Sequence, residues 1–145
     1  MTAYPDAQNH EKTPAFDLAT ALAAITALIE EEVANGIPLS RIVVGGFSQG
    51  GAMSLYAGLQ YPATLAGVLV MSGYLPKSEG FSVSDAAKRT PVAHFHGAAD
   101  PNPGTFPLQS ERMYQALKGL GGTARLCMLP MEGHFYRARE SVLHA

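Results

Sequence analysis

A serine enclosed by glycines is the residue of this chain with the clearest potential for chemistry. Residues 45–51 read Gly-Gly-Phe-Ser-Gln-Gly-Gly and contain the pattern Gly-x-Ser-x-Gly around Ser48. Between a strand and a helix, this pattern forms a tight turn that pushes the serine hydroxyl beyond the edge of the sheet. Glycines are expected on both sides because side chains there would collide. We therefore predict Ser48 as a nucleophile and the backbone amide of Gln49 as a donor to the oxyanion.

A serine hydroxyl needs a base, because it is too weakly acidic to attack at neutral pH. Asp100 follows one expected strand through a short Gly-Ala-Ala segment, and His134 follows the last expected strand. The carboxyl ends of parallel strands meet at one edge of a sheet, so both side chains are expected near Ser48. The order serine, aspartate, histidine fits a nucleophile, its orienting acid and its base.

Alternating strands and helices are needed to position these residues. Apolar periodicity predicts helices, β-branched runs predict buried strands, and glycine or proline marks their ends. The fold class expected is α/β, with a mostly parallel sheet flanked by helices and each strand covered on both faces. Helices are predicted over 16–35, 52–59 and 107–120, strands over 41–46, 65–71, 91–96 and 124–129, and a surface loop over 72–90.

Other histidines compete with His134. His10 and His144 lie near the ends of the chain and are expected at the surface. His94 and His96 lie on a predicted strand, where a packed, hydrogen-bonded histidine is the usual outcome. Together with Asp100 they also suggest a metal site, but the sequence offers no further clear ligands, so no metal is predicted. The alternative interpretation of residues 45–51 is a glycine-rich turn that contributes to packing and not to chemistry.

The composition excludes several other classes of protein. The chain has 145 residues, 47% of them hydrophobic and 15% charged, with a net charge of −2. One compact domain is expected, and nothing favours binding to nucleic acid or to an anionic membrane. The lone Cys127 has no partner for an intrachain disulfide, and no segment suits a transmembrane helix or a secretory signal. We therefore predict a cytoplasmic protein without cofactors.

The same residues resemble a known family. Residues 42–55, around the serine, are similar to the nucleophile region of the phospholipase/carboxylesterase family, which includes the acyl-protein thioesterases. Residues 72–76, 91–101 and 133–134 resemble its following segments in the same order. The resemblance implies an α/β-hydrolase fold and the hydrolysis of carboxylic esters or thioesters, including S-acylated proteins and lysophospholipids. It implies a triad of Ser48, Asp100 and His134, and it implies Phe47, Tyr74 and Leu75 as substrate-binding residues.

Two segments depart from the family pattern. Family members have strands and a His-Gly-Leu-Gly-Asp type loop before the serine, and that loop supplies a second oxyanion donor. Here residues 1–14 read as a polar leader, and residues 15–145 as a hydrolase-like domain without those strands. Residues 102–106 replace a short apolar turn. The alternative is therefore a non-catalytic homologue that binds acyl groups or a partner subunit, and an uncovered strand edge favours a homodimer.

Overall fold

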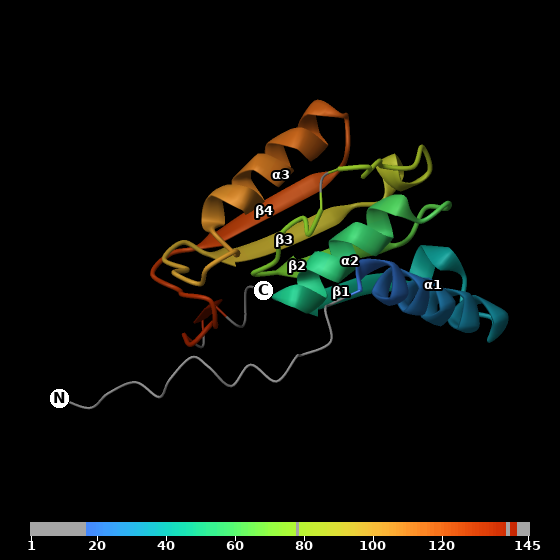
Figure 1. Ribbon diagram of the computed structural model, residues 1–145, viewed down its shortest axis with the longest axis horizontal. Helices are drawn as coiled ribbons and strands as arrows, with labels where there is room; N and C mark the ends of the chain where they lie inside the picture. Colours follow the sequence, from blue (N-terminus) through green and yellow to red (C-terminus); the bar gives the residue numbers. More distant parts are fainter. Residues whose placement is uncertain (1–16, 78, 139, 142–145) are drawn as a thin grey trace.

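Four parallel strands form one sheet in the order β1-β2-β3-β4 (Figure 1). The computed structural model describes residues 17–77, 79–138 and 140–141, so the predicted leader, residues 1–14, lies outside the described residues. The elements are α1 (Leu18–Ala34), η1 (Leu39–Arg41), β1 (Val43–Phe47), α2 (Gln49–Gln60), β2 (Gly67–Met71), η2 (Ala87–Arg89), β3 (Val92–Gly97), α3 (Pro107–Gly119) and β4 (Ala124–Leu129).

The predicted elements are confirmed, with small shifts at their ends. The largest shift is at α2, which begins at Gln49 rather than at residue 52, because the chain enters the helix directly after Ser48. The segment predicted as a surface loop contains a single short 3-10 helix, η2. The parallel sheet with flanking helices is also confirmed.

The helices lie on one side of the sheet (Figure 1). Because the strands are added in sequence order in one direction, crossovers of one hand place every connecting helix on the same face. The apolar contacts agree, since α2 and α3 share one core cluster with β2 and β3, while α1 packs beside β1 in a second cluster. The first cluster contains Leu55, Leu59, Val68, Val70, Val92 and Leu117, and the second contains Ile29, Ile42, Tyr61 and Leu65.

The expectation of strands covered on both faces is wrong for β1 within the described residues. Val44 packs into the cluster beneath α1, whereas the side chain of its neighbour Val43 is 58% exposed on the opposite face. In the described part of the chain, β1 is also hydrogen-bonded on one side only, to β2. The apolar run of β1 therefore contributes both core and exposed surface.

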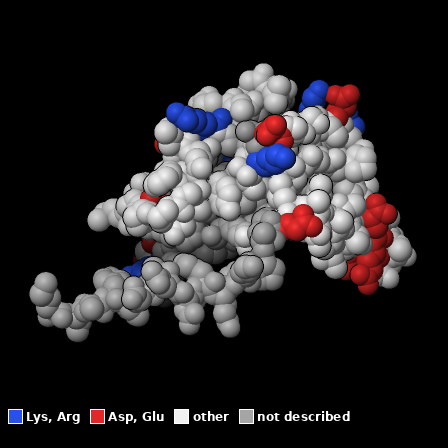
Figure 2. Space-filling view, in the orientation of Figure 1, with Lys and Arg blue, Asp and Glu red and all other residues white. Residues whose placement is uncertain are grey.

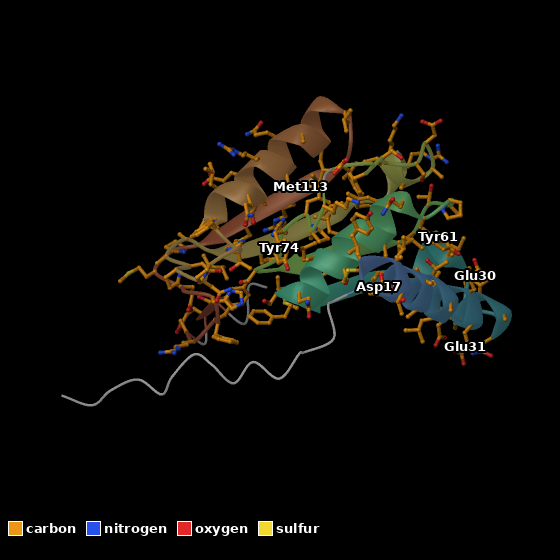
Figure 3. All side chains as sticks on the ribbon, viewed as in Figure 1. Asp17, Glu30, Glu31, Tyr61, Tyr74 and Met113 are labelled. Carbon is orange, nitrogen blue, oxygen red and sulfur yellow. The ribbon has the colours of Figure 1, made fainter. Side chains whose placement is uncertain are left out.

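The first helix is fixed at its start and charged near its end. The carboxylate of Asp17 accepts a hydrogen bond from the backbone N–H of Ala19, as expected for a residue that caps a helix. Glu30 and Glu31 lie at the far end of α1 (Figure 3), where acidic side chains gather on the surface (Figure 2). These exposed carboxylates form a solvated outer face.

Candidate active site

Ser48 occupies the turn between β1 and α2. Its φ is 55° and its ψ is −119°, a conformation that residues other than glycine rarely adopt. Two hydrogen bonds hold the turn: the Ser48 N–H donates to the carbonyl oxygen of Met71 at 2.8 Å, and the N–H of Ala52 donates to the Ser48 carbonyl oxygen at 2.9 Å. The surrounding structure therefore imposes the strained backbone that points the hydroxyl outward.

The glycines of the turn are not equivalent. A Cβ on Gly46 would lie 2.5 Å from the carbonyl carbon of Gly50, and a Cβ on Gly51 would lie 2.8 Å from the carbonyl oxygen of Gly46. A Cβ on Gly50 would meet no atom within 4 Å. The expectation that glycine is needed on both sides of the serine is therefore correct for Gly46 and wrong for Gly50. On the helix side, the position that has no room for a Cβ is Gly51.

Gln49 is the first residue of α2. The first backbone N–H groups of a helix have no acceptor within the helix, and they form the positive end of its dipole. The Gln49 amide thus lies immediately beside Ser48, where an oxyanion donor is needed. Its role as a donor stays a prediction.

The three residues predicted to act together lie within hydrogen-bond distance of one another. The hydroxyl oxygen of Ser48 is 2.9 Å from Nε2 of His134, and Nδ1 of His134 is 2.8 Å from Oδ2 of Asp100. Because Nδ1 faces a carboxylate, it carries the ring proton, and Nε2 then accepts a hydrogen bond from the Ser48 hydroxyl. The side chain of Asp100 is fully buried and that of His134 is 11% exposed, so the pair is largely shielded from solvent.

Several donors surround the carboxylate of Asp100. Burial raises the pKa of Asp100, but hydrogen bonds from His134, the Asn102 backbone N–H and His96 outweigh it and hold the pKa below its usual value. The Asn102 N–H lies 2.8 Å from Oδ1, and the Thr105 hydroxyl lies 3.3 Å from Oδ2. The residues after Asp100, which differ from the family pattern, thus hold the carboxylate in place. Sequence reasoning missed Thr105, because its contact depends on how the loop folds back.

A second set of hydrogen bonds holds the backbone of residues 130–136, which follow β4 and are called the histidine loop below. The Ser72 hydroxyl lies 3.0 Å from both the carbonyl oxygen of His134 and the hydroxyl of Tyr136. Tyr136 donates in turn to the carbonyl oxygen of Phe95. Sequence reasoning missed this fastening, and the one local sign of it is the positive φ of Ser72, 48°, directly after β2. The loop is therefore tied to the ends of β2 and β3.

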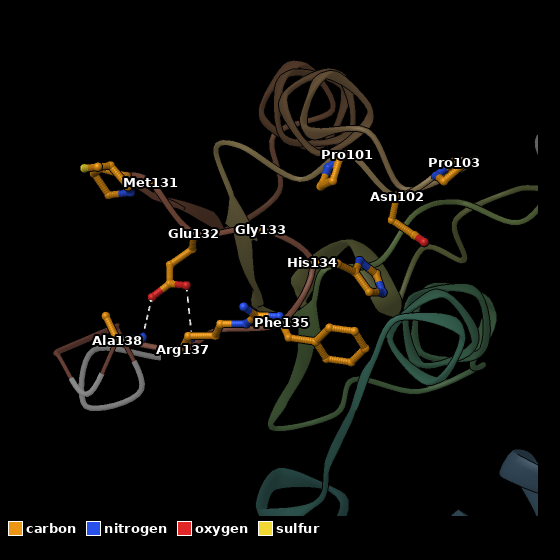
Figure 4. A pocket seen from close by; sticks show the side chains of 11 residues that line it. Pro101, Asn102, Pro103, Met131, Glu132, Gly133, His134, Phe135, Arg137 and Ala138 are labelled. Carbon is orange, nitrogen blue, oxygen red and sulfur yellow. Dashed lines mark hydrogen bonds between the residues drawn. The ribbon is translucent and has the colours of Figure 1, made fainter. Parts of the chain in front are cut away.

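The pocket beside His134 lies between the histidine loop and residues 98–106, which follow β3, contain Asp100 and are called the acid loop below (Figure 4). Its volume is about 820 Å³, and Phe135 and the strongly exposed Met131 give it apolar walls. The carboxylate of Glu132 closes its base by accepting hydrogen bonds from the backbone N–H groups of Arg137 and Ala138. The cavity is therefore lined by one member of the candidate triad, His134, together with apolar side chains.

The three predicted substrate-binding residues take different positions. The ring of Phe47 lies 5.0 Å from the ring of His134 and 5.4 Å from that of Phe135, centroid to centroid. Tyr74 follows β2 and is half-buried (Figure 3). Leu75 packs against the core cluster shared by α2 and α3. Of the three, Phe47 is the one in contact with the candidate triad.

The two histidines of β3 bind a common serine. Nε2 of His94 and Nδ1 of His96 lie 2.9 and 2.6 Å from the hydroxyl oxygen of Ser110 in α3. Nε2 of His96 lies 3.0 Å from Oδ2 of Asp100. These ring nitrogens are thus engaged in hydrogen bonds, and in the described part of the chain no three His, Cys, Asp or Glu side chains are grouped to hold a metal ion.

Gly97, the last residue of β3, is the point of closest approach between the acid and histidine loops. A Cβ there would lie 2.1 Å from the carbonyl oxygen of Gly133 and 2.4 Å from that of Glu132. Gly97→Ala is expected to push the histidine loop away and lower kcat/KM by about 100-fold or more, since a misplacement of about 1 Å can have that effect. Ester hydrolysis measures it. Gly119→Ala, where a Cβ meets no atom within 4 Å, is the matched control. Equal activity of the two variants would contradict the prediction.

Comparison with known proteins decides the family. A family model described as phospholipase/carboxylesterase matches residues 4–137. The chain belongs to this family. Acyl-protein thioesterase 1 of Gibberella zeae is 43% identical to this family member over 112 residues, which are 74% of this chain and 46% of that protein. Acyl-protein thioesterase 1 of Schizosaccharomyces pombe is 49% identical over 76 residues, which are 51% and 34% of the two chains.

Solved structures show the same relationship. The crystal structure of Arabidopsis thaliana SOBER1 matches this phospholipase/carboxylesterase family member with a TM-score of 0.78 and 29% identity, over 88% of this chain and 60% of that one. The fold is therefore that of an α/β-hydrolase. The chain spans about half the length, or less, of the curated relatives it matches. Among the described helices, none combines the length and apolarity needed to cross a membrane.

Proposed function

We propose that this chain is a serine hydrolase that cleaves carboxylic esters or thioesters through an acyl-enzyme. The observation that carries the proposal is the continuous path of short contacts from the Ser48 hydroxyl through His134 to the buried carboxylate of Asp100. Membership of the phospholipase/carboxylesterase family supports it independently, since sequence matching does not use these distances.

The proposed reaction has two steps. Nε2 of His134 takes the Ser48 proton as the serine oxygen attacks the acyl carbon, and the Gln49 amide donates to the oxyanion. His134 then protonates the departing alcohol or thiol, and the acyl group stays on Ser48. A water molecule then gives a proton to His134 and attacks the acyl carbon. As the bond between the acyl carbon and the Ser48 oxygen breaks, His134 returns that proton to the serine oxygen and the carboxylic acid leaves. The carboxylate of Asp100 stabilises the imidazolium in both steps.

The proposed substrate is an acyl ester or thioester, such as an S-acylated protein or a lysophospholipid. The relatives named acyl-protein thioesterases support this choice. The apolar rings of Phe47 and Phe135 beside His134 suit an acyl chain better than a charged group. Action in the cytoplasm is part of the proposal, supported by the free Cys127.

Labelling with a fluorophosphonate tests the proposal. Such a probe reacts with a serine only where a neighbouring base activates it, so we expect labelling of the wild-type chain and none of Ser48→Ala. Mass spectrometry of the peptide containing Ser48 locates the adduct. Folded wild-type protein that stays unlabelled, yet still binds a fatty acid, would overturn the proposal in favour of the non-catalytic, acyl-binding alternative.

A homodimer also stays a prediction. Among the described residues, β1 is hydrogen-bonded to β2 alone, which favours a dimer because an exposed strand edge can pair with another chain. The 58% exposed side chain of Val43 and the 61% exposed side chain of Leu28 in α1 add apolar surface there. Sedimentation velocity at micromolar concentration distinguishes a dimer from a monomer.

A further inference from the structure

The carboxylate of Asp100 is bound on its inner side by a histidine that the proposed reaction does not use. His96 is fully buried, and its Nε2 lies 3.0 Å from Oδ2 of Asp100, the same oxygen that faces His134. Five contacts therefore run in series from the interior to the surface. They join His94, Ser110, His96, Asp100, His134 and Ser48.

The surroundings of His96 settle where its ring proton lies. Nε2 faces two acceptors, the carboxylate of Asp100 and the backbone carbonyl oxygen of Thr105 at 2.7 Å. A nitrogen between two acceptors must carry the hydrogen, so Nε2 donates. On the other side of the ring, the Ser110 hydroxyl at 2.6 Å from Nδ1 holds the imidazole in this orientation.

We propose that His96 is a positioning residue for the reaction at Ser48, acting through the hydrogen bond from its Nε2–H to Asp100. The inference rests on the proposed function. The bond does two things: it helps to fix the carboxylate oxygen where Nδ1 of His134 meets it, and it adds one donor to those that already share the negative charge of Asp100. An aspartate in a buried pocket needs such donors, because an ionised group without partners is costly to bury.

Few other charged groups act on this carboxylate. His94 and His96 from β3 and His134 and Tyr136 from the histidine loop are the titratable groups nearest to it. The elements around Asp100 also carry other titratable residues, and the charge that acts on the pKa of Asp100 comes from His134; these residues are Glu132 in the histidine loop and Arg137 directly after it, Glu111, Arg112, Tyr114 and Lys118 in α3, and Arg125 and Cys127 in β4. The pKa of His94 is lowered to about 4, chiefly by burial and secondly by the neighbouring His96, so His94 is neutral at pH 7. Burial raises the pKa of Tyr136, which is also neutral. From α3 comes the uncharged Ser110, and from β4 the uncharged Met128 opposite His96. The negative charge of Asp100 is therefore shared among four polar neighbours, of which His96 and His134 are the titratable ones; the other two are the Asn102 N–H and the Thr105 hydroxyl.

Two substitutions separate positioning from packing. His96→Leu removes the donor, and we expect kcat/KM to fall by about 10- to 100-fold, the scale of a hydrogen bond to a charged group. The less neutralised Asp100 then favours protonated His134, so the acid limb of the kcat/KM profile moves to higher pH. His96→Gln places an N–H at a similar reach, and it is expected to restore most of the rate and the wild-type position of the limb.

Controls make each outcome decisive. Thr90→Val removes a buried hydroxyl between η2 and β3, which accepts a hydrogen bond from the Leu65 N–H, and should leave the acid limb in place. Ser110→Ala leaves His96 unsupported and should move the limb in the same direction as His96→Leu, which tests the idea even where the leucine variant does not fold. Equal losses in the glutamine and leucine variants with an unmoved limb would overturn the proposal. A folded His96→Leu or Ser110→Ala variant with the wild-type kcat/KM and the wild-type position of the acid limb would also overturn the proposal. Wild-type protein that fluorophosphonate does not label would overturn the proposed function as well, which distinguishes the two failures.

Discussion

Replacing Ser48 with alanine is expected to lower kcat for an activated ester by about 10⁶-fold, the scale seen when the nucleophile of a serine hydrolase is removed. In the proposed reaction the Ser48 hydroxyl oxygen attacks the acyl carbon, and alanine removes the group that contacts Nε2 of His134. Alanine at φ 55° is about as strained as serine, and the backbone hydrogen bond to Met71 is kept, so the fold should persist. Hydrolysis of a p-nitrophenyl ester measures the loss.

Ser54→Ala is the matched control for this variant. Ser54 is a buried serine of α2 whose hydroxyl donates to the carbonyl oxygen of Gly50. Its removal deletes one hydroxyl near the turn without touching the reacting atoms, and activity should change by only a few-fold. Retention of more than about one hundredth of the wild-type rate by Ser48→Ala would mean that the turnover arises elsewhere.

Asp100→Asn is expected to lower kcat by about 10⁴-fold. One oxygen of Asp100 accepts from the Asn102 N–H, and the other faces donors on both His96 and His134. An amide in either orientation turns an N–H toward at least one of these donors. If it faces His134, the ring moves its proton to Nε2 and can no longer accept from Ser48. The measurement is kcat for the same ester, with circular dichroism to establish folding.

The control for the aspartate is Asp85→Asn. The side chain of Asp85 is 95% exposed and pairs with Lys88 at 2.6 Å on the surface, far from the carboxyl edge of the sheet. Its substitution removes the same charge from the protein, and the rate should stay at the wild-type value. A loss below about 10-fold for Asp100→Asn would argue that His134 needs no orienting carboxylate.

Most of the fold could be predicted from the sequence because each signal was local. The apolar runs that became β1 to β4 are flanked by glycine or proline, and the stripe of α1 ends at the Asn-Gly turn after Ala34. The meeting of Ser48, Asp100 and His134 needed one further rule, that parallel strands end at a common edge. That rule used only the order of the elements, so it required no distances.

The rest depended on tertiary contacts that have no local signal. The Gly-x-Ser-x-Gly pattern places glycines at positions 46 and 50. In the structure, the positions of this turn where a Cβ would collide with backbone are Gly46 and Gly51, because Gly51 packs against β1. A continuous apolar strand does not reveal that all helices lie on one face and leave Val43 exposed. His96 looked like a packed core histidine, because its distance to Asp100 depends on how the chain turns after Gly97.

The wide separation of the reacting residues in the chain has a consequence for folding. Ser48 and His134 are 86 residues apart, and their contact requires β1 to β4 to be paired in order. A partly folded chain that has formed only β1, α2 and β2 contains the serine turn but no base. Reactivity of Ser48 is thus a reporter of the fully assembled sheet, and its loss in denaturant should coincide with global unfolding rather than with fraying of any single helix.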